Sequence, residues 1–406
     1  MGHMAGLDSR WVPMVAVFLL LAGGCTPPEE EGVVRIAVSC PAKFVTGREM
    51  IAGIELALQE VGGAVRGHRV ELRIFDVADP EGLRTSPEAE IQAARDAAAD
   101  PAVVGYIGPL FSDQARLSIP ILNQAGVPQI SPSASWPGLT RAGFEPGEPG
   151  MYYPTGRRTF YRVIPNDERQ VVAAADWAYA MGFRRFYILE GKSSYARGMA
   201  GIFRERVHDF DATVVGHDSM AEGPKNQAEL RTYAQRVLAA EPDMIFFSGD
   251  FQSEGEVSHY RILEAIRKVD PQVAVMTPET LANRILLERT GGVLQDRVFG
   301  VSGAIPPRYQ DSPRARQFSR DFQNQFNRIP GTLGSLSYEA AMVLLEAMEN
   351  AASLTREDIL AALDQLGAPR GALMDWRLDA AGDRLGAGVV GLTVKENEWV
   401  FAKVLD

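Results

Sequence analysis

Residues 102–135 read AVVGYIGPLFSDQARLSIPILNQAGVPQISPSAS, and this stretch decides the fold. Its first six residues, 102–107, are small, apolar or β-branched, which is typical of a strand buried on both faces. Gly108-Pro109 ends the run, and Ser112 stands where a helix with one apolar face can begin. The next strand is expected at residues 127–130. The stretch therefore predicts two successive strands of a parallel sheet.

Both of these strands end in polar loops. Ser112 follows the first, and the run Ser133, Ala134 and Ser135 follows the second. Small ligands of open α/β sheets bind outside the carboxyl ends of strands, and the start of a helix suits a carboxylate. These residues are therefore candidate ligand-binding residues. The alternative, that both loops are ordinary turns capped by serine, stays open at this point.

Size and composition exclude several classes of protein. The chain has 406 residues, of which 46% are hydrophobic, which allows two or three domains with substantial cores. The net charge of -11 argues against nucleic-acid binding. Two cysteines allow no disulfide framework, and the five histidines are scattered, so we expect no metal and no cofactor. The chain has no P-loop and no G-x-G-x-x-G motif, which disfavours nucleotide chemistry.

The amino-terminal region predicts export and lipidation. The apolar run at 12–22 is too short to span a bilayer and fits the core of a signal peptide that covers residues 1–24. The segment LAGGC resembles a bacterial lipobox in which Cys25 takes the lipid, and residues 25–32 would then be a polar tether. We expect a bacterial extracytoplasmic protein anchored to a membrane by lipid. An ordinary secretory peptide that contains a cysteine is the alternative.

The rest of the chain alternates strands and helices in two series, with a restart near Asn166. In the second series we expect helices at 167–181, 194–208, 227–239 and 256–268, and strands at 184–190, 212–217, 243–248 and 272–277. A mixed region with helices near 313–326, 334–351 and 356–365 follows, and a hairpin at 389–405 ends the chain. This order predicts an α/β protein with two doubly wound parallel-sheet lobes.

The second series also presents polar groups at its strand ends. Tyr195, Asp250 and Glu279 each follow an expected strand. If this edge faces the serine loops of the first series, the two edges together suit a zwitterion, with a carboxylate on one side and an ammonium on the other. Three simpler explanations stay open, in which Glu279 caps a helix, Tyr195 lies in the core and Asp250 lies in a solvated loop.

Several of these segments resemble the type I periplasmic binding proteins, the group of the leucine/isoleucine/valine-binding proteins of ABC transporters. The resemblance covers residues 33–404 and is carried by AVVGYIGPLFSDQ, GVPQISPSASWPGLT, FYRVIPND, GKSSYARG, TPETLAN and GSLSYEAA. It implies two lobes joined by a hinge of three strands. We place lobe 1 at 33–165 and 304–368, and lobe 2 at 166–303 and 369–406.

The resemblance also implies roles for individual residues. Ser112, the backbone at Ser133 and the hydroxyl of Ser135 would bind an α-carboxylate. The carbonyl oxygen of Ser133 and the carboxylate of Glu279 would bind the α-amino group, and Tyr195 would close over the ligand.

Two positions depart from the family pattern. Asp250 stands where the branched-chain binders tend to carry tyrosine, and a second buried anion disfavours a purely aliphatic ligand side chain. The segment SCPAKFVTG lacks the glycine-rich form of the family and places Phe44 near the mouth of the site. The amino acid that is bound therefore stays open.

The function implied by the resemblance is capture of an amino acid between the lobes and its delivery to an ABC permease by a monomer without a cofactor. An enzyme is disfavoured, because no G-x-S-x-G segment occurs and no nucleophile is placed to meet His217, the only histidine near the end of an expected strand. Two alternatives stay open. One is a ligand sensor of the same fold that signals to a membrane partner, and the other is a binder of a small carboxylate or amide other than an amino acid.

Overall fold

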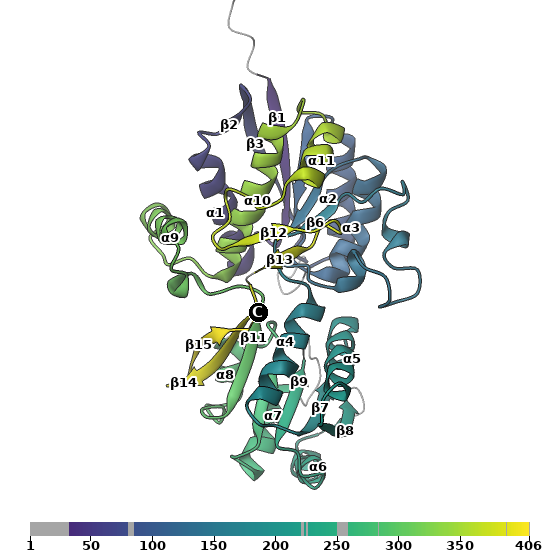
Figure 1. The fold of residues 1–406 in the computed structure, drawn as a ribbon, viewed down its shortest axis with the longest axis vertical. Helices are drawn as coiled ribbons and strands as arrows, with labels where there is room; N and C mark the ends of the chain where they lie inside the picture. Colours follow the sequence, from purple (N-terminus) through teal and green to yellow (C-terminus); the bar gives the residue numbers. More distant parts are fainter. Residues whose placement is uncertain are drawn as a thin grey trace, which may run out of the picture.

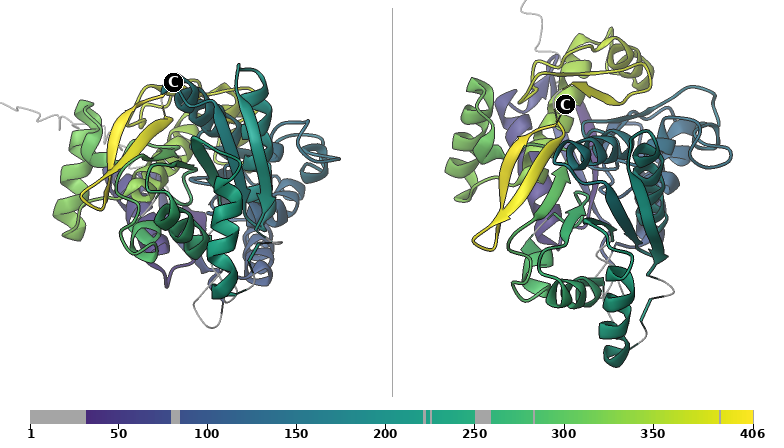
Figure 2. Two further views of the ribbon diagram at one scale, coloured as in Figure 1. Left: turned by 90° about the horizontal axis from the view of Figure 1, so that it is seen from below. Right: turned by 60° about the horizontal axis from the view of Figure 1, so that its bottom comes forward.

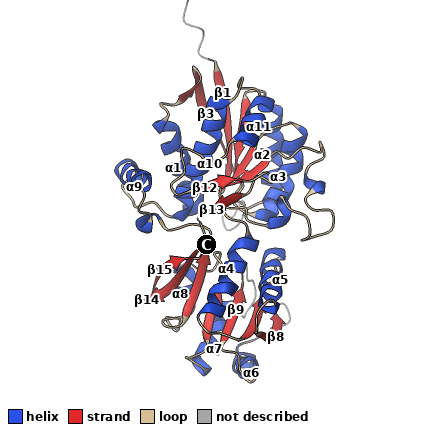
Figure 3. Cartoon of the chain, in the orientation of Figure 1, coloured by secondary structure: helices blue, strands red, loops and turns tan. Residues whose placement is uncertain are grey.

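The computed structural model describes residues 32–79, 85–220, 223–224, 226–249, 259–282, 284–386 and 388–405. They form two α/β lobes, one above the other in Figure 1, and each lobe is built on its own sheet. Figure 3 shows that strands form the centre of each lobe and helices its outside. The expected signal peptide, Cys25 and Asp250 lie outside the described residues.

The first lobe contains a six-stranded sheet in the order β2-β3-β1-β4-β5-β6. All neighbouring strands are parallel except β2 and β3. The strands are β1 (Val33–Cys40), β2 (Ala64–Val65), β3 (His68–Asp76), β4 (Val103–Ile107), β5 (Gln129–Ser131) and β6 (Phe160–Arg162). The helices that the chain places between them are α1 (Val45–Glu60), α2 (Pro87–Ala99) and α3 (Ser112–Gln124).

Three helices from late in the chain return to this lobe. They are α9 (Pro313–Phe326), α10 (Thr332–Asn350) and α11 (Arg356–Gln365). Helix α10 is buried over most of its length because it packs between α1 and the sheet. A Cβ atom on Gly53 of α1 would overlap the backbone oxygen of Gly334, so this glycine permits the close approach of α1 and α10.

The second lobe contains a seven-stranded sheet in the order β15-β14-β11-β10-β9-β7-β8. Its parallel strands are β7 (Arg185–Glu190), β8 (Thr213–Ser219), β9 (Met244–Ser248), β10 (Ala274–Thr277) and β11 (Val298–Ser302). Two antiparallel strands, β14 (Val390–Lys395) and β15 (Glu398–Val404), form a hairpin at one edge, as Figure 2 shows.

Helices cover both faces of this sheet. Residues of α4 (Asp167–Ala180) and α5 (Ser194–His208) share one hydrophobic cluster with the sheet. Residues of α6 (Gln227–Leu238), α7 (His259–Val269) and α8 (Arg284–Arg289) share another. The two doubly wound lobes that the sequence predicted are therefore confirmed. No helix among the described residues is both long enough and apolar enough to cross a membrane.

Three connections join the lobes, between β6 and α4, between β11 and α9, and between β13 and β14. Before the third connection, the short strands β12 (Trp376–Leu378) and β13 (Arg384–Gly386) pair with each other. Trp376 and Leu378 belong to the hydrophobic cluster of the first lobe. We therefore propose that the last boundary lies after β13, later than the expected residue 369. Strands of three residues carry no readable periodicity, which is why the sequence did not indicate them.

Candidate functional site

The loops after β4 and β5 are fastened to each other by serine hydroxyls. Ser131 and Ser133 each donate at 2.7 Å to a backbone carbonyl of the loop that follows β4. The backbone N–H of Trp136 donates to Ser112 Oγ at 3.0 Å. The N–H groups of Ser133 and Ala134 both donate to Ser131 Oγ, at 3.2 and 2.8 Å. Ser131, which the sequence analysis did not single out, therefore organises the loop that contains the predicted residues.

The start of α3, beside these loops, has hydrogen-bond donors that are available to a ligand. The residue before the helix, Phe111, provides no side-chain cap. The Ser112 hydroxyl accepts a bond from Trp136, and its own proton can still be donated. Gln114 in the first turn is 4% exposed, and neither atom of its amide has a hydrogen-bond partner. A helix N-terminus with an unpaired buried amide is suited to an anionic group. Gln114 carried no signal in the sequence.

Two carboxyl groups, one fully buried and one half-buried, lie close to each other at the junction of the lobes. Glu279 follows β10 in the second lobe, and its Oε2 accepts the backbone N–H of Gly303 at 3.0 Å. Burial raises the pKa of the Glu279 carboxyl to about 7, while bonds from Gly303 and Gln170 partly oppose the shift. Asp167, the first residue of α4, is fully buried. Burial raises its pKa to about 7, and the charge of Glu279 contributes to the increase.

Asp167 is joined to the serine loop of the first lobe. Its backbone N–H donates to the carbonyl oxygen of Ser135 at 2.9 Å, and the Ser135 hydroxyl lowers the pKa of the Asp167 carboxyl. Apart from the Ser135 hydroxyl, no donor among the described residues lies in hydrogen-bond geometry to the Asp167 carboxylate oxygens. The structure therefore brings Ser135 and Glu279 together through Asp167. The sequence analysis missed Asp167 because it read as an ordinary acidic residue at the start of a helix.

A buried ionic network holds the serine loop against the hinge. Arg162, with no exposed surface, donates to the carbonyl oxygens of Ala134 and Trp136 at 3.0 and 2.8 Å and to Asp383 at 2.8 Å. Asn166, which caps α4, donates to the same Asp383 at 3.1 Å. The pKa of Asp383 is below its ordinary value because the Arg162 charge and bonds from neighbouring groups outweigh burial. Arg162 therefore fixes the backbone of this loop, and Asp383, which is distant in the chain, holds Arg162 in place.

Of the remaining predicted residues, Tyr195 and Phe44 lie at the starts of helices, and Asp250 lies outside the described residues. Tyr195 lies in the first turn of α5 and packs against the hydrophobic cluster of that helix. Phe44 is the half-buried residue that precedes α1. For Asp250 the structure gives no position. Within the described part of the chain, no group of three or more His, Cys, Asp or Glu side chains could hold a metal ion.

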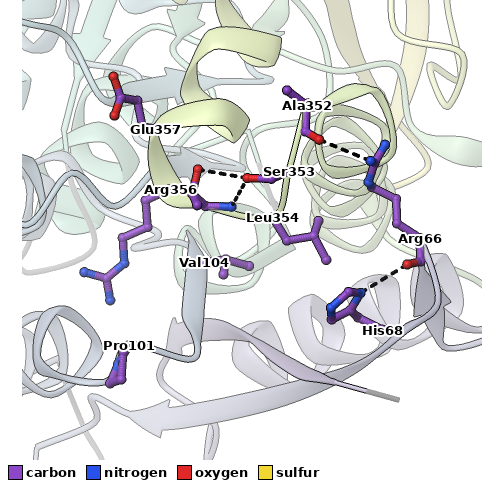
Figure 4. Close-up of a pocket in the computed structure, with 10 residues that line it drawn as sticks. Arg66, His68, Pro101, Val104, Ala352, Ser353, Leu354, Arg356 and Glu357 are labelled. Carbon is purple, nitrogen blue, oxygen red and sulfur yellow. Dashed lines mark hydrogen bonds between the residues drawn. The ribbon is translucent and has the colours of Figure 1, made fainter. Parts of the chain in front are cut away.

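A separate pocket of about 800 Å³ lies at the opposite edge of the first sheet, where β3 and β4 begin (Figure 4). The Arg66 guanidinium donates to two backbone carbonyls at and just after the end of α10. Arg356 donates to carbonyls at the ends of α2 and α3 and to that of Val103. These basic groups bond to the carbonyl groups at helix ends, which gives them a structural role. The acid pair and the serine loops therefore remain the candidate ligand site.

Known proteins resemble this chain over most of its length. Residues 35–397 match the family model described as periplasmic binding protein. The chain belongs to this family. A Leu/Ile/Val-binding protein homolog from Brucella melitensis is 23% identical over 58% of each chain. That match covers less than two thirds of the relative. A leucine-, isoleucine-, valine-, threonine- and alanine-binding protein from Pseudomonas aeruginosa is 21% identical, over 85% of this chain and 86% of the relative.

Solved structures confirm the fold. An ABC transporter substrate-binding protein from Desulfitobacterium hafniense in complex with Leu has a TM-score of 0.75 at 22% identity. The comparison covers 91% of this chain and all of that one. The family resemblance and the fold class that the sequence predicted are both confirmed. Family members bind solutes outside the cytoplasm and are not enzymes.

Proposed function

We propose that this protein captures an amino acid between its two lobes and delivers it to an ABC permease. The observation that carries the proposal is the acid pair, which consists of the fully buried Asp167 and the half-buried Glu279. No cation contributes to the pKa of Glu279, and for Asp167 the Ser135 hydroxyl and the charge of Arg162 only partly oppose the increase in pKa that burial causes. Buried carboxyl groups without an ion-pair partner are costly, and an ammonium group from a ligand would offset that cost.

The carboxylate of the same ligand would bind at the start of α3. Ser112 can donate its hydroxyl proton, and the unpartnered amide of Gln114 lies in the same helical turn. The N–H groups of Ser133 and Ala134 already donate to Ser131, so they contribute only if this loop rearranges. A ligand held in this way has an anionic and a cationic group, as an α-amino acid has.

The ligand would bridge the lobes, because the two halves of the site come from different lobes. Ser112 and Gln114 belong to the first lobe, and Glu279 belongs to the second. A bridging ligand favours the closed arrangement by the contacts that it makes only when both lobes are near. The closed surface would then be what a permease recognises. Tyr195, Phe44 and Asp250 remain candidates for contacts with the ligand side chain.

The proposal includes lipid anchoring at Cys25 to a bacterial membrane, on the periplasmic or cell-surface side, and a monomeric state. Proteins of similar fold are substrate-binding proteins of ABC transporters, which supports delivery. The alternatives from the sequence stay in place, namely a sensor of the same fold and a binder of another small carboxylate or amide. A second buried acid favours ligands with a cation over ligands that have only a carboxylate.

A thermal-shift screen against the amino acids and small carboxylates tests the proposal. A ligand that binds only the native state stabilises it by about 2.7 kcal/mol at a hundredfold excess over its dissociation constant. We expect one or more amino acids to raise the melting temperature of the wild-type protein and to have no effect on a Glu279→Ala variant. A hit with a basic or polar amino acid would support Asp250 as a specificity residue. Stabilisation only by carboxylates without an amino group would overturn the proposal.

A further inference from the structure

The indole ring of Trp136 is held in place entirely by the first lobe. Trp136 follows directly after Ser135 and is 5% exposed. It belongs to a small hydrophobic cluster with residues of α3 and of the loop between β5 and β6. Its backbone N–H donates to Ser112 Oγ at 3.0 Å. The backbone of Trp136 is therefore bonded to Ser112, and its ring packs beside the same helix.

A buried carboxylate fixes the orientation of this ring. Trp136 Nε1 lies 3.0 Å from both carboxylate oxygens of Glu148, whose side chain has no exposed surface. The Tyr152 hydroxyl donates to Glu148 at 2.6 Å, and Arg116 forms an ion pair with Glu148 at 3.3 Å. The Arg116 guanidinium also lies 5.3 Å from the centre of the indole ring. Charge-assisted bonds of this kind leave the ring little freedom to turn.

The far edge of the ring reaches the second lobe at a glycine. A Cβ atom on Gly198 of α5 would overlap Cζ3 of Trp136 and would lie 2.6 Å from Cη2. Glycine is unfavourable inside a helix compared with alanine, so its presence there calls for a reason. Gly201, one turn further along α5, has nothing within 4 Å of the same atom. The close approach of Trp136 therefore distinguishes Gly198 from its neighbour on the same helix.

We propose that Trp136 and Gly198 form the contact that limits how far the two lobes close. The indole ring acts as a fixed stop on the first lobe. Because Gly198 has no side chain, α5 leaves the space that the ring occupies. Since Gly198 lies one helical turn from Tyr195, this stop sets the width of the region between the serine loops and the start of α5. The proposal concerns closure alone and holds whichever ligand the site takes.

Double electron–electron resonance between spin labels tests this directly. Labels at the exposed positions Arg95 on α2 and Gln235 on α6 report the separation of the lobes, in full-length protein in which Cys25 is replaced by serine. The distance is measured without ligand and with a millimolar mixture of the twenty common amino acids. The variants are Gly198→Ala, the matched control Gly201→Ala, and the double variant Gly198→Ala with Trp136→Phe.

In at least one of the two conditions, the wild-type protein should show the distance between the two labels that corresponds to contact between Trp136 and Gly198. This distance is called the short separation. Gly198→Ala should lower the population of that separation about tenfold, because one extra methyl group overpacks a filled contact. Gly201→Ala should leave the distribution unchanged, and Trp136→Phe should restore it in the Gly198→Ala background, since the smaller ring makes room for the methyl group.

Three results would overturn the proposal. These are the absence of the short separation from the wild-type protein in both conditions, equal distributions for the two alanine variants, and no rescue by Trp136→Phe. If Gly198→Ala does not fold, Trp136→Leu gives an independent test. That variant removes the stop and should broaden the distribution, and an unchanged distribution would count against the proposal.

Discussion

Replacing Glu279 with glutamine should stabilise the ligand-free protein and weaken ligand binding at the same time. Burial raises the pKa of the Glu279 carboxyl from 4.5 to about 7. A buried acid with a raised pKa binds its proton more tightly in the folded than in the unfolded state. Its contribution to folding is therefore most favourable at low pH and is lost as the pH rises from about 4.5 to about 7.

The size of the effect follows from that shift. Each pKa unit corresponds to 1.36 kcal/mol, so the wild-type protein loses up to about 3 kcal/mol through this group on going from pH 4 to pH 8. Glutamine does not titrate and escapes this loss. At pH 8 the variant should therefore melt about 3 to 5 °C higher than the wild type, and at pH 4 the two should melt together. Affinity for an amino acid should fall at least about 30-fold, because the ammonium loses its charged partner.

Glu90→Gln is the matched control. Glu90 is a fully buried acid of the first lobe whose pKa burial raises to about 7, and the Tyr106 hydroxyl donates to it at 2.8 Å. Replacing Glu90 with glutamine should likewise remove a loss of stability between pH 4 and pH 8, and it should leave ligand affinity unchanged. Thermal melts from pH 4 to pH 8, with titration calorimetry of the ligand found by screening, measure both quantities. A Glu279→Gln variant that is less stable than the wild type at pH 8, or that binds with wild-type affinity, would refute the reasoning.

Three further predictions concern the hinge, the anchor and a strained turn. Arg162→Met breaks a buried ion pair and should cost about 3 to 5 kcal/mol of unfolding free energy in denaturant titrations. Arg157→Met, in an exposed pair, should cost less than about 1 kcal/mol, and equal losses would contradict the account. Cys25→Ser should move the protein from the membrane fraction to the soluble fraction, and retention in the membrane would disprove lipid anchoring. Gly108→Ala should cost about 2 kcal/mol or more, since φ is +124° and the Cβ would crowd a backbone oxygen of β1. Gly126→Ala, where φ is +66° with open space around it, should cost about 1 kcal/mol by the same melts, and a larger loss there than at Gly108 would contradict this explanation.

The sequence was sufficient for the regular elements because their signals are local. Helix α5 has the predicted bounds of 194–208, since Ser193 caps it and its apolar residues recur at helical spacing. The predicted helix at 256–268 is described only from His259, and α7 runs to Val269. The three-residue strands β12 and β13 were missed because they are too short to show a period.

The candidate site was predictable only in part. Glu279 and the serine loops follow from the rule that ligands bind at the carboxyl ends of parallel strands. Asp167 and Trp136 gave no such signal, because their importance depends on burial and on contacts with residues far away in the chain. Asp167 acts through its proximity to Glu279, and Trp136 through the glycine that it meets in the other lobe. Such contacts arise from tertiary structure and cannot be inferred from local patterns.

The central claim is that the site takes a ligand with both an ammonium and a carboxylate group. Titration calorimetry with three matched compounds tests it most directly. These compounds are the amino acid that gives the largest thermal shift, the same acid without its amino group, and the corresponding amine without its carboxylate. The account predicts that only the intact amino acid binds, because the acid pair and the start of α3 each need a partner. Equally tight binding of the acid that lacks the amino group would contradict it.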